Sequence, residues 1–505
     1  MKEKILKIAL KILFPLEFVI SFILVWLVYL TMTTKNYAGY WSRDLLLGLI
    51  PMAILLIAIL ILNYIKNKKQ IEKIFLGFMI PIGLCYLVFM GPEYTPDENA
   101  HLWKSYEISQ GQIITPIDEE GKSHTEVPKD FIRSYSNYNE LNMLLTSQET
   151  DYQDTETLVN PAQNYNPVLY MFSSIGLIIG KALGMNGTLI QYVARMLNYI
   201  VFLICSYWAI KKIPFGKLLL STYLFMPMVI HQAISISADS LINSVLLFYI
   251  AYNLFLFFKK EEMRTYEMVI YIVMSAFVGI TKIVYFPLVG MSLFFIFKKD
   301  MKKSQKQIMI ISSIVITMIV TCLWYAFSLK YTGHEEYLLE HNVNAKEQIK
   351  YVLTNPKQGI KVLLNTVTVR GEIYLYTMIG SNLGWLDIGV PMIKIIGFIL
   401  LIVLSIFFEK NEVSLSVKQR LWLIGITFAI MVLILMALYV GWTGVGGEII
   451  DGVQGRYFIP IMILPLLCCA MKDNYVKIKN IHVYMLLAIS LLNVSVISNV
   501  YHFFI

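Results

Sequence analysis

The sequence predicts an all-α integral membrane protein with about 13 transmembrane helices. The 505-residue chain is 57% hydrophobic and only 15% charged, which is too apolar for an ordinary soluble domain. Its apolar runs are close to the length that a helix needs to cross a bilayer. Lysine and arginine residues fall in the short loops between these runs, so the net charge of +8 reflects membrane orientation rather than nucleic-acid binding.

The apolar runs give the predicted spans in chain order. They lie at residues 9–31, 45–64, 73–91, 188–210, 213–232, 238–258, 266–281, 283–298, 307–329, 391–408, 420–440, 456–471 and 479–503. The long run at 266–298 is divided at Lys282, because an unpaired lysine at mid-bilayer is unfavourable. The basic start at Met1–Lys4 is followed by a run too long for a signal peptide, so we expect a retained span. The five cysteines all lie in apolar runs and have no metal or disulfide spacing.

The loop charges predict the orientation of the chain. With a cytoplasmic N-terminus, every inside loop is basic, namely residues 66–73, 211–217, 259–264, 298–306, 410–420 and 472–479. Segment 91–166 is then outside, and it holds 14 Asp and Glu against four Lys and Arg. Residues 167–184 are apolar enough to span, but a crossing there would reverse all later loops. We therefore expect a helix that lies flat on the outer surface or re-enters the membrane.

The candidate site begins with an acidic cluster after the third span, Pro96-Asp97-Glu98-Asn99-Ala100-His101. Carboxylates at the membrane edge are costly unless they bind or react with something, so Asp97 and Glu98 are candidate catalytic residues. His101 lies one helical turn from Asp97 and would share its face. The alternative is a helix start with acidic residues in its first turn. Asp239 is a second candidate carboxylate, although a helix N-terminus would also explain it.

Three cations are expected near bilayer depth on the outer side: Arg195, Lys282 and Arg456. Such cations pair with carboxylates or headgroups, or they bind the phosphate of a lipid-linked ligand, which a guanidinium grips with two nitrogens. Further candidate substrate-binding residues are Tyr165, Trp385, Asp387, Gln454 and Tyr457. Two outer carboxylates could also hold a divalent cation, but the spacing does not establish a metal site. The chain has no nucleotide-binding glycine motif, so a nucleotide-driven cytoplasmic mechanism has no support.

These motifs resemble the signature of a bacterial family of polytopic membrane proteins known as a domain of unknown function. The resemblance is carried by Pro96-Asp97-Glu98-x-x-His101, Tyr106-x-Ile108-Ser109-x-Gly111, Ser235-Ile-Ser237-Ala-Asp239, Lys282-x-x-Tyr285, Gly384-Trp385-Leu386-Asp387 and Gln454-Gly455-Arg456-Tyr457-Phe458-x-Pro460. It runs from about residue 73 to the C-terminus. Residues 1–72 would then be two additional membrane helices on a 73–505 transmembrane domain, with outer loops at 91–187 and 330–390.

That family is similar to the glycosyltransferases of the C-type membrane fold (GT-C), such as protein O-mannosyltransferases and aminoarabinose transferases. The resemblance implies that Asp97 corresponds to their catalytic carboxylate and that a polyprenyl-phosphate-sugar is the donor. It also supports a flat helix after the first outer loop. This chain lacks their large soluble C-terminal domain, which leaves acceptor recognition to the two outer loops.

The sequence is therefore interpreted as a glycosyltransferase of the bacterial plasma membrane whose active site faces outside. It would move a sugar, with inversion, from a polyprenyl-phosphate donor to a cell-surface glycan, teichoic acid or lipid-linked acceptor. Asp97 would be the base, and Arg456, with Arg195 or Lys282, would neutralise the departing phosphate. The alternatives are a transporter or flippase of lipid-linked glycans and a glycan polymerase. The sequence names neither the sugar nor the acceptor.

Overall fold

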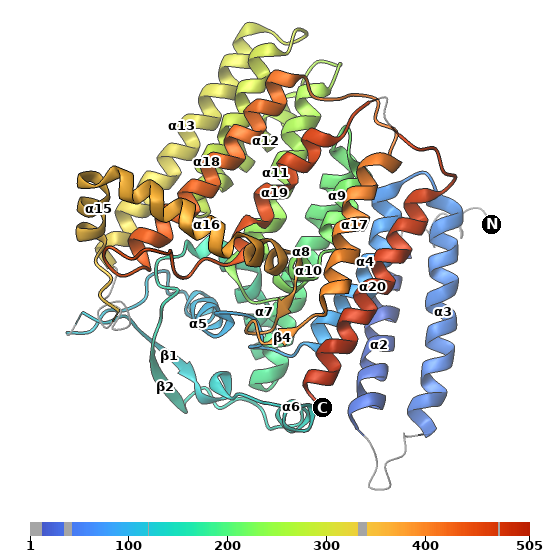
Figure 1. Ribbon diagram of the computed structural model, residues 1–505. Coiled ribbons are helices and arrows are strands. Elements are labelled where there is room, and N and C mark those ends of the chain that lie inside the picture. Colours follow the sequence, from blue (N-terminus) through green and yellow to red (C-terminus); the bar gives the residue numbers. More distant parts are fainter. Residues whose placement is uncertain (1–12, 35–42, 120, 332–340, 473–474) are drawn as a thin grey trace.

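The computed structural model describes residues 13–34, 43–119, 121–331, 341–472 and 475–505. It is mostly helical, and its few strands form two small antiparallel pairs, as expected of an all-α membrane protein (Figure 1). Among the described residues, eight helices are long and apolar enough to cross a membrane. The basic N-terminal residues and the predicted start of the first span lie outside the described residues.

The helices of the apolar bundle coincide with the predicted spans. They are α2 (Leu13–Thr33), α3 (Arg43–Asn67), α4 (Ile71–Phe89), α8 (Gly187–Lys212), α9 (Lys217–Leu224), α10 (Pro227–Ala233), α11 (Ala238–Phe258), α12 (Thr265–Ile280), η3 (Ile283–Phe297), α13 (Lys303–Ser328), α17 (Met392–Phe408), α18 (Val417–Gly441), α19 (Ile459–Cys469) and α20 (Ile481–Phe503). Pro227 divides the predicted 213–232 span into α9 and α10, because proline cannot continue the helix hydrogen bonds. Some of these helices are shorter than a full span, so the number of crossings stays a prediction.

The remaining elements belong to the two large loops and the approach to α19. They are α5 (Glu98–Ser109), β1 (His124–Pro128), η1 (Lys129–Ile132), α6 (Tyr138–Leu145), β2 (Thr155–Val159), η2 (Pro167–Tyr170), α7 (Met171–Ala182), η4 (Leu329–Tyr331), α15 (Ala345–Thr354), α16 (Pro356–Ile379), β3 (Asn382–Leu383), β4 (Ile388–Gly389) and η5 (Gly455–Phe458). Helices α15 and α16 lie across the direction of the bundle (Figure 1).

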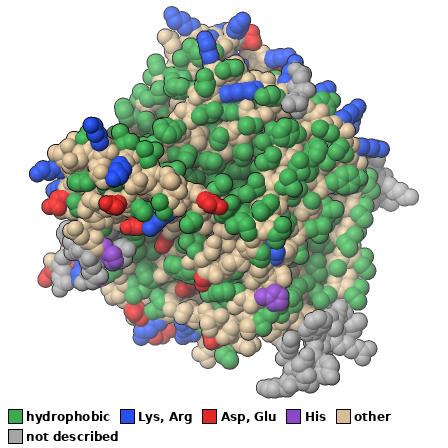
Figure 2. Space-filling model, viewed as in Figure 1, with side chains coloured by type: hydrophobic (Ala, Val, Ile, Leu, Met, Phe, Trp, Pro, Cys, Tyr) green, Lys and Arg blue, Asp and Glu red, His purple; other side chains and the backbone are tan. Residues whose placement is uncertain are grey.

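The two ends of the bundle differ in charge. Lys and Arg side chains line one end of the visible face, where few Asp and Glu are seen; a broad hydrophobic surface follows, and most visible Asp and Glu lie toward the other end, together with some Lys and Arg (Figure 2). Hydrogen bonds join the predicted inside loops and the helix ends beside them: Lys217 N donates to Glu409, Lys298 Nζ to Phe257 O, and Asn480 Nδ2 to Tyr64. The basic loops therefore share one end of the bundle, as the alternation of loops requires.

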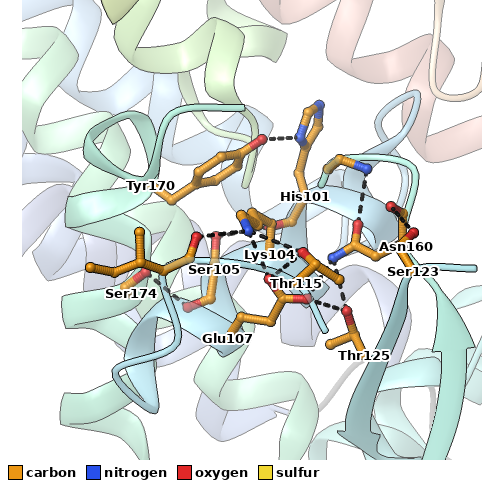
Figure 3. A network of polar contacts seen from close by, with 12 residues as sticks. His101, Lys104, Ser105, Glu107, Thr115, Ser123, Thr125, Asn160, Tyr170 and Ser174 are labelled. Carbon is orange, nitrogen blue, oxygen red and sulfur yellow. Dashed lines mark hydrogen bonds and ion pairs between the residues drawn. The ribbon is translucent and has the colours of Figure 1, made fainter. Parts of the chain in front are cut away.

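The first large loop is held to α5 by one buried carboxylate. Glu107 accepts hydrogen bonds from Lys104 Nζ at 2.9 Å, Thr115 Oγ1 at 2.8 Å and Asn160 Nδ2 at 3.1 Å, and also from Thr125 (Figure 3). Thr125 lies on β1, and Asn160 directly follows β2. Because every member of this buried network has a partner, it orders the β1–β2 strand pair against the helix.

Helix α7 occupies most of the segment that we expect to lie flat on the membrane surface or to re-enter the membrane. With η2 directly before it, the apolar helix runs from Pro167 to Ala182, and it is shorter than the eight helices that are long enough to cross a membrane. A Cβ on Gly176 would come within 2.4 Å of Ala194 Cα, so glycine lets α7 touch α8. The helix also exposes apolar side chains, namely Met171, Ile175, Ile178 and Ile179. This length and exposed apolar face fit a helix at the membrane surface.

Candidate functional site

The acidic cluster lies where α4 leaves the bundle and α5 begins. Glu93 and Asp97 both have φ of 66°, a left-handed conformation that costs a residue other than glycine on the order of 1 kcal/mol or more. Asp97 occupies the N-cap position of α5, but its side chain makes no capping hydrogen bond. The carboxylate is half exposed and instead accepts a hydrogen bond from Arg456 Nη2 at 2.5 Å. A capping role therefore does not explain Asp97.

Arg456 joins the acidic cluster to the rest of the site. Its side chain is only 3% exposed, and its Nη1 donates to Pro96 O at 2.9 Å. Its Nε lies 3.9 Å from Asp239 Oδ2 but is buried without a hydrogen-bond partner among the described residues. The guanidinium thus contacts two carboxylates and retains one unused donor.

Asp239 and Lys282 complete this group of charges. Lys282 Nζ donates to Asp239 Oδ1 at 2.7 Å. The ammonium also lies 4.6 Å from the centre of the Tyr457 ring and 5.6 Å from that of Tyr165, within the range of cation–π attraction. The order Asp97, Arg456, Asp239, Lys282 alternates in sign, and we call these four residues the charge chain.

Glu98 and Arg195 form a separate, fully buried ion pair. Arg195 Nε and Nη2 each donate to a Glu98 oxygen at 2.8 Å, and Glu98 also accepts from the backbone N of Ile236 at 2.7 Å. Neither side chain has exposed surface. This geometry ties the α5 start and α8 to the segment before α11, and it leaves neither group accessible to a ligand from solvent.

His101 lies behind Asp97 on α5. Its Nδ1 is hydrogen-bonded to the Tyr170 hydroxyl at 2.7 Å, and its ring meets that of Tyr165 edge-on at 5.2 Å. Burial lowers the pKa of His101 to about 4, so the imidazole is neutral at neutral pH. His101 therefore contacts Tyr165 and Tyr170 and adds no positive charge to the site.

A groove of about 280 Å³ opens beside the charge chain. Lys282 lines it beside the aromatic rings of Tyr165 and Tyr457, further polar and aromatic residues complete that part of the wall, and the aliphatic part comes from η2, α12, η3 and α18. We call it the lipid-type groove, because a cation meets a wall of aliphatic and aromatic side chains. Its apolar side chains are Leu169, Ile280, Ile283, Val284, Ile434, Ala437 and Leu438.

The other predicted site residues lie around the same end of the bundle. Trp385, at the tip of the β3–β4 hairpin, donates from Nε1 to Glu93 O at 2.9 Å. Asp387 is hydrogen-bonded to Tyr94. Gln454 precedes Arg456, and its buried side-chain oxygen has no partner among the described residues. The structure therefore brings the predicted residues from seven separate segments to one end of the molecule.

Sequence reasoning missed several neighbours of this site. Glu93 is a carboxylate four residues before Asp97, and it accepts from Gln191 Nε2 at 2.9 Å. Burial raises the pKa of Glu93 to about 8. Its position at the same membrane edge was the available signal. Trp103 and Tyr135 gave no signal, because aromatic residues at such a depth usually act as interface anchors.

The described residues do not form a metal site of the usual kind. They contain no group of three or more His, Cys, Asp or Glu arranged to hold an ion. Asp97 and Asp239 both contact cationic side chains instead. The pair of carboxylates considered for a divalent cation therefore does not fit one in this arrangement.

The fold and the site define a polytopic helical membrane protein with a partly buried group of charges at one end of its bundle. The model of one family, described as predicted membrane proteins (DUF2142), matches residues 80–465. The chain belongs to this family, which confirms the first resemblance drawn from the sequence motifs. No curated protein and no solved structure matches the chain.

Proposed function

We propose that the protein is a glycosyltransferase that takes a sugar from a polyprenyl-phosphate donor and transfers it to a glycan or lipid-linked acceptor outside the membrane. The observation that carries this proposal is the charge chain beside the lipid-type groove. A largely apolar groove with Lys282 in its lining, and with Arg456 next to its lining residue Tyr457, suits a ligand with a long hydrocarbon tail and a phosphate head.

The residues divide the reaction between them. The acceptor hydroxyl oxygen forms a bond to the anomeric carbon as the bond from that carbon to the phosphate oxygen breaks. Asp97 takes the hydroxyl proton, and the bonding electron pair leaves with the polyprenyl phosphate. Lys282 and Arg456 stabilise the charge that develops on that phosphate. Direct displacement inverts the anomeric centre.

The contact between Arg456 and Asp97 adds an order to these events. One Asp97 oxygen is occupied by the hydrogen bond from Arg456 Nη2 at 2.5 Å. An incoming phosphate competes for Arg456, and the free Nε of Arg456 is a ready donor to it. Donor binding thereby releases Asp97 for the acceptor, so the donor binds first.

The alternative from another class is a transporter of lipid-linked glycans, and one residue favours it. Glu17 is buried within α2, and neither of its carboxylate oxygens has a hydrogen-bond partner among the described residues. An ionisable group inside a span is a common feature of transport pathways. However, Glu17 lies before the family match at residues 80–465, whereas the whole charge chain lies within it.

Substitution of the base tests the proposal. We expect Asp97→Asn to abolish sugar transfer and leave the protein folded, because the amide keeps the size of the side chain but cannot take the proton. The measurement is the surface glycan composition of a deletion strain that carries wild-type or variant protein, with membrane-protein level and thermal stability determined in parallel.

Asp154→Asn is the matched control. Asp154 is 54% exposed and paired with Lys129, much as Asp97 is 52% exposed and paired with Arg456. The control should restore the wild-type glycan. Full restoration by Asp97→Asn would reject the catalytic role of this residue.

A further inference from the structure

A second groove, of about 360 Å³, adjoins the Asp97 loop. Its lining includes Glu93, Tyr94, Asn99, Trp103, Tyr135 and Trp385. It shares no lining residue with the lipid-type groove. The two are linked through the site, because Glu93 and Asn99 flank Asp97, and Tyr457 of the lipid-type groove directly follows Arg456. We call the second one the aromatic groove.

The walls of the aromatic groove are held in place by named contacts. Trp385 is fixed by its hydrogen bond to Glu93 O, yet its indole remains 44% exposed. The ring centres of Tyr94 and Tyr135 are 5.8 Å apart, and Asp387 is hydrogen-bonded to Tyr94. The groove therefore presents positioned aromatic rings rather than a loose apolar surface.

Two polar atoms of this lining are unused. Trp103 Nε1 and the Tyr135 hydroxyl are buried and have no hydrogen-bond partner among the described residues. The whole Tyr135 residue is only 8% exposed. An unpaired buried polar group is costly, which makes both groups candidates for a ligand contact. The raised pKa of Glu93, about 8, keeps that carboxyl largely protonated at neutral pH, so it can donate as well as accept.

We propose that the aromatic groove binds the carbohydrate acceptor and presents its hydroxyl to Asp97. Sugar rings have C–H faces that pack on aromatic rings and hydroxyl edges that need donors and acceptors, and this groove offers both. A lipid tail would leave its polar groups unpaired and would meet only two aliphatic side chains besides Pro92, namely Ile132 and Leu158, whereas the lipid-type groove has seven aliphatic lining residues. This assignment rests on the proposed glycosyltransferase function.

The test measures carbohydrate binding directly. The probe is the oligosaccharide mixture released by mild acid from the surface glycan of a deletion strain, titrated by calorimetry into the full-length protein in detergent. We expect binding by the wild type, a loss of about tenfold or more for Trp385→Ala, and a smaller loss for Trp385→Phe, which keeps a ring. The control Trp208→Ala removes a tryptophan of similar exposure, 41%, from α8 and should bind normally.

Three outcomes would overturn the assignment: no binding by the wild type, equal binding by Trp385→Ala, or an equal loss in the Trp208→Ala control. If Trp385→Ala fails to fold, Glu156→Gln replaces it, because Glu156 is an exposed lining residue on β2 and its substitution should only weaken binding severalfold. Normal binding by Glu156→Gln would then reject the groove.

The same proteins separate this assignment from the proposed function. Affinity for polyprenyl phosphate should be unchanged in Trp385→Ala, because the lipid-type groove does not include Trp385. If Asp97→Asn restores the surface glycan but Trp385→Ala still loses oligosaccharide binding, the catalytic proposal fails and the groove stands as a glycan site. If only the oligosaccharide experiment fails, the acceptor binds elsewhere.

Discussion

Arg456 is the residue that contacts most of the candidate site, and the sequence indicated its importance but not its partners. Its position near the membrane edge predicted that it would meet an anion. Both alternatives, phosphate and carboxylate, remained open, since nothing in the spacing of residues 97, 239 and 456 shows that they meet. The structure gives it Asp97 at 2.5 Å and Asp239 at 3.9 Å. Likewise, nothing in the sequence distinguished the accessible Asp97 from the buried Glu98.

Replacing Arg456 separates a phosphate-binding role from a structural one. We expect Arg456→Lys to weaken polyprenyl-phosphate binding although it keeps the charge, because lysine cannot offer two nitrogens in a planar fork. Arg456→Ala should weaken it further and also destabilise the protein, since it leaves Asp239 with fewer partners. Affinity and thermal stability should be measured on the same purified samples. Lowered stability with normal affinity in both variants would reject the phosphate role.

The carboxyl of Glu93 predicts a pH dependence of stability. Burial raises its pKa from 4.5 to about 8 in the folded protein, so the folded state holds a proton that the unfolded chain releases. The stabilisation present below pH 4.5 is therefore lost as the pH rises toward 8. Glu93→Gln lacks this ionisation. The melting temperature of this variant should therefore rise relative to that of the wild type as the pH is raised over this interval. A constant difference would show that Glu93 is ionised in the folded protein.

At the scale of elements, hydrophobic run lengths predicted where the helices lie, and close backbone contacts decide how the site is built. Every predicted span falls on a helix or on a closely spaced helix pair. Run length could not reveal the break at Pro227 or the β3–β4 hairpin that positions Trp385. The hairpin includes Leu386 with φ of 70°, a conformation that its sequence does not favour. Such features depend on contacts between distant segments, which no local pattern encodes.

Gly455 makes such a contact, and it determines where Arg456 lies. A Cβ at this position would come within 2.3 Å of Tyr374 O and 2.4 Å of Met378 N, both backbone atoms of α16. Gly455→Ala should therefore push η5 away from α16, lower thermal stability and reduce transfer. Gly425→Ala is the control, because nothing lies within 4 Å of its added Cβ and α18 is a regular helix. Equal effects of both changes would show that the contact at Gly455 does not position the site.

At the scale of the whole molecule, the charges divide the bundle into two ends, and the candidate site lies at the end away from the basic loops. Helix α4 begins beside Lys73 and ends just before the Asp97 loop, and its 19 residues span about 28 Å. That distance is close to the thickness of the bilayer core. The sequence predicted this separation because the positive-inside rule depends on composition alone. It could not predict which outer residues meet across the separate loops.

The proposed function requires that the end with the candidate site face outside, and labelling of intact cells tests this. Ser136 lies in the first large loop and Ser304 at the start of α13, and both side chains are exposed. The exposed Cys322 and Cys469 would first be replaced by serine to remove background reactivity. Ser136→Cys should then react with a membrane-impermeant maleimide, whereas Ser304→Cys should react only after the cells are opened.

The reverse pattern would place the acidic loop in the cytoplasm, away from any extracellular acceptor, and the glycosyltransferase proposal would fail with it. Labelling at both positions in intact cells would indicate leaky cells or mixed insertion, which a cytoplasmic marker protein in the same sample distinguishes.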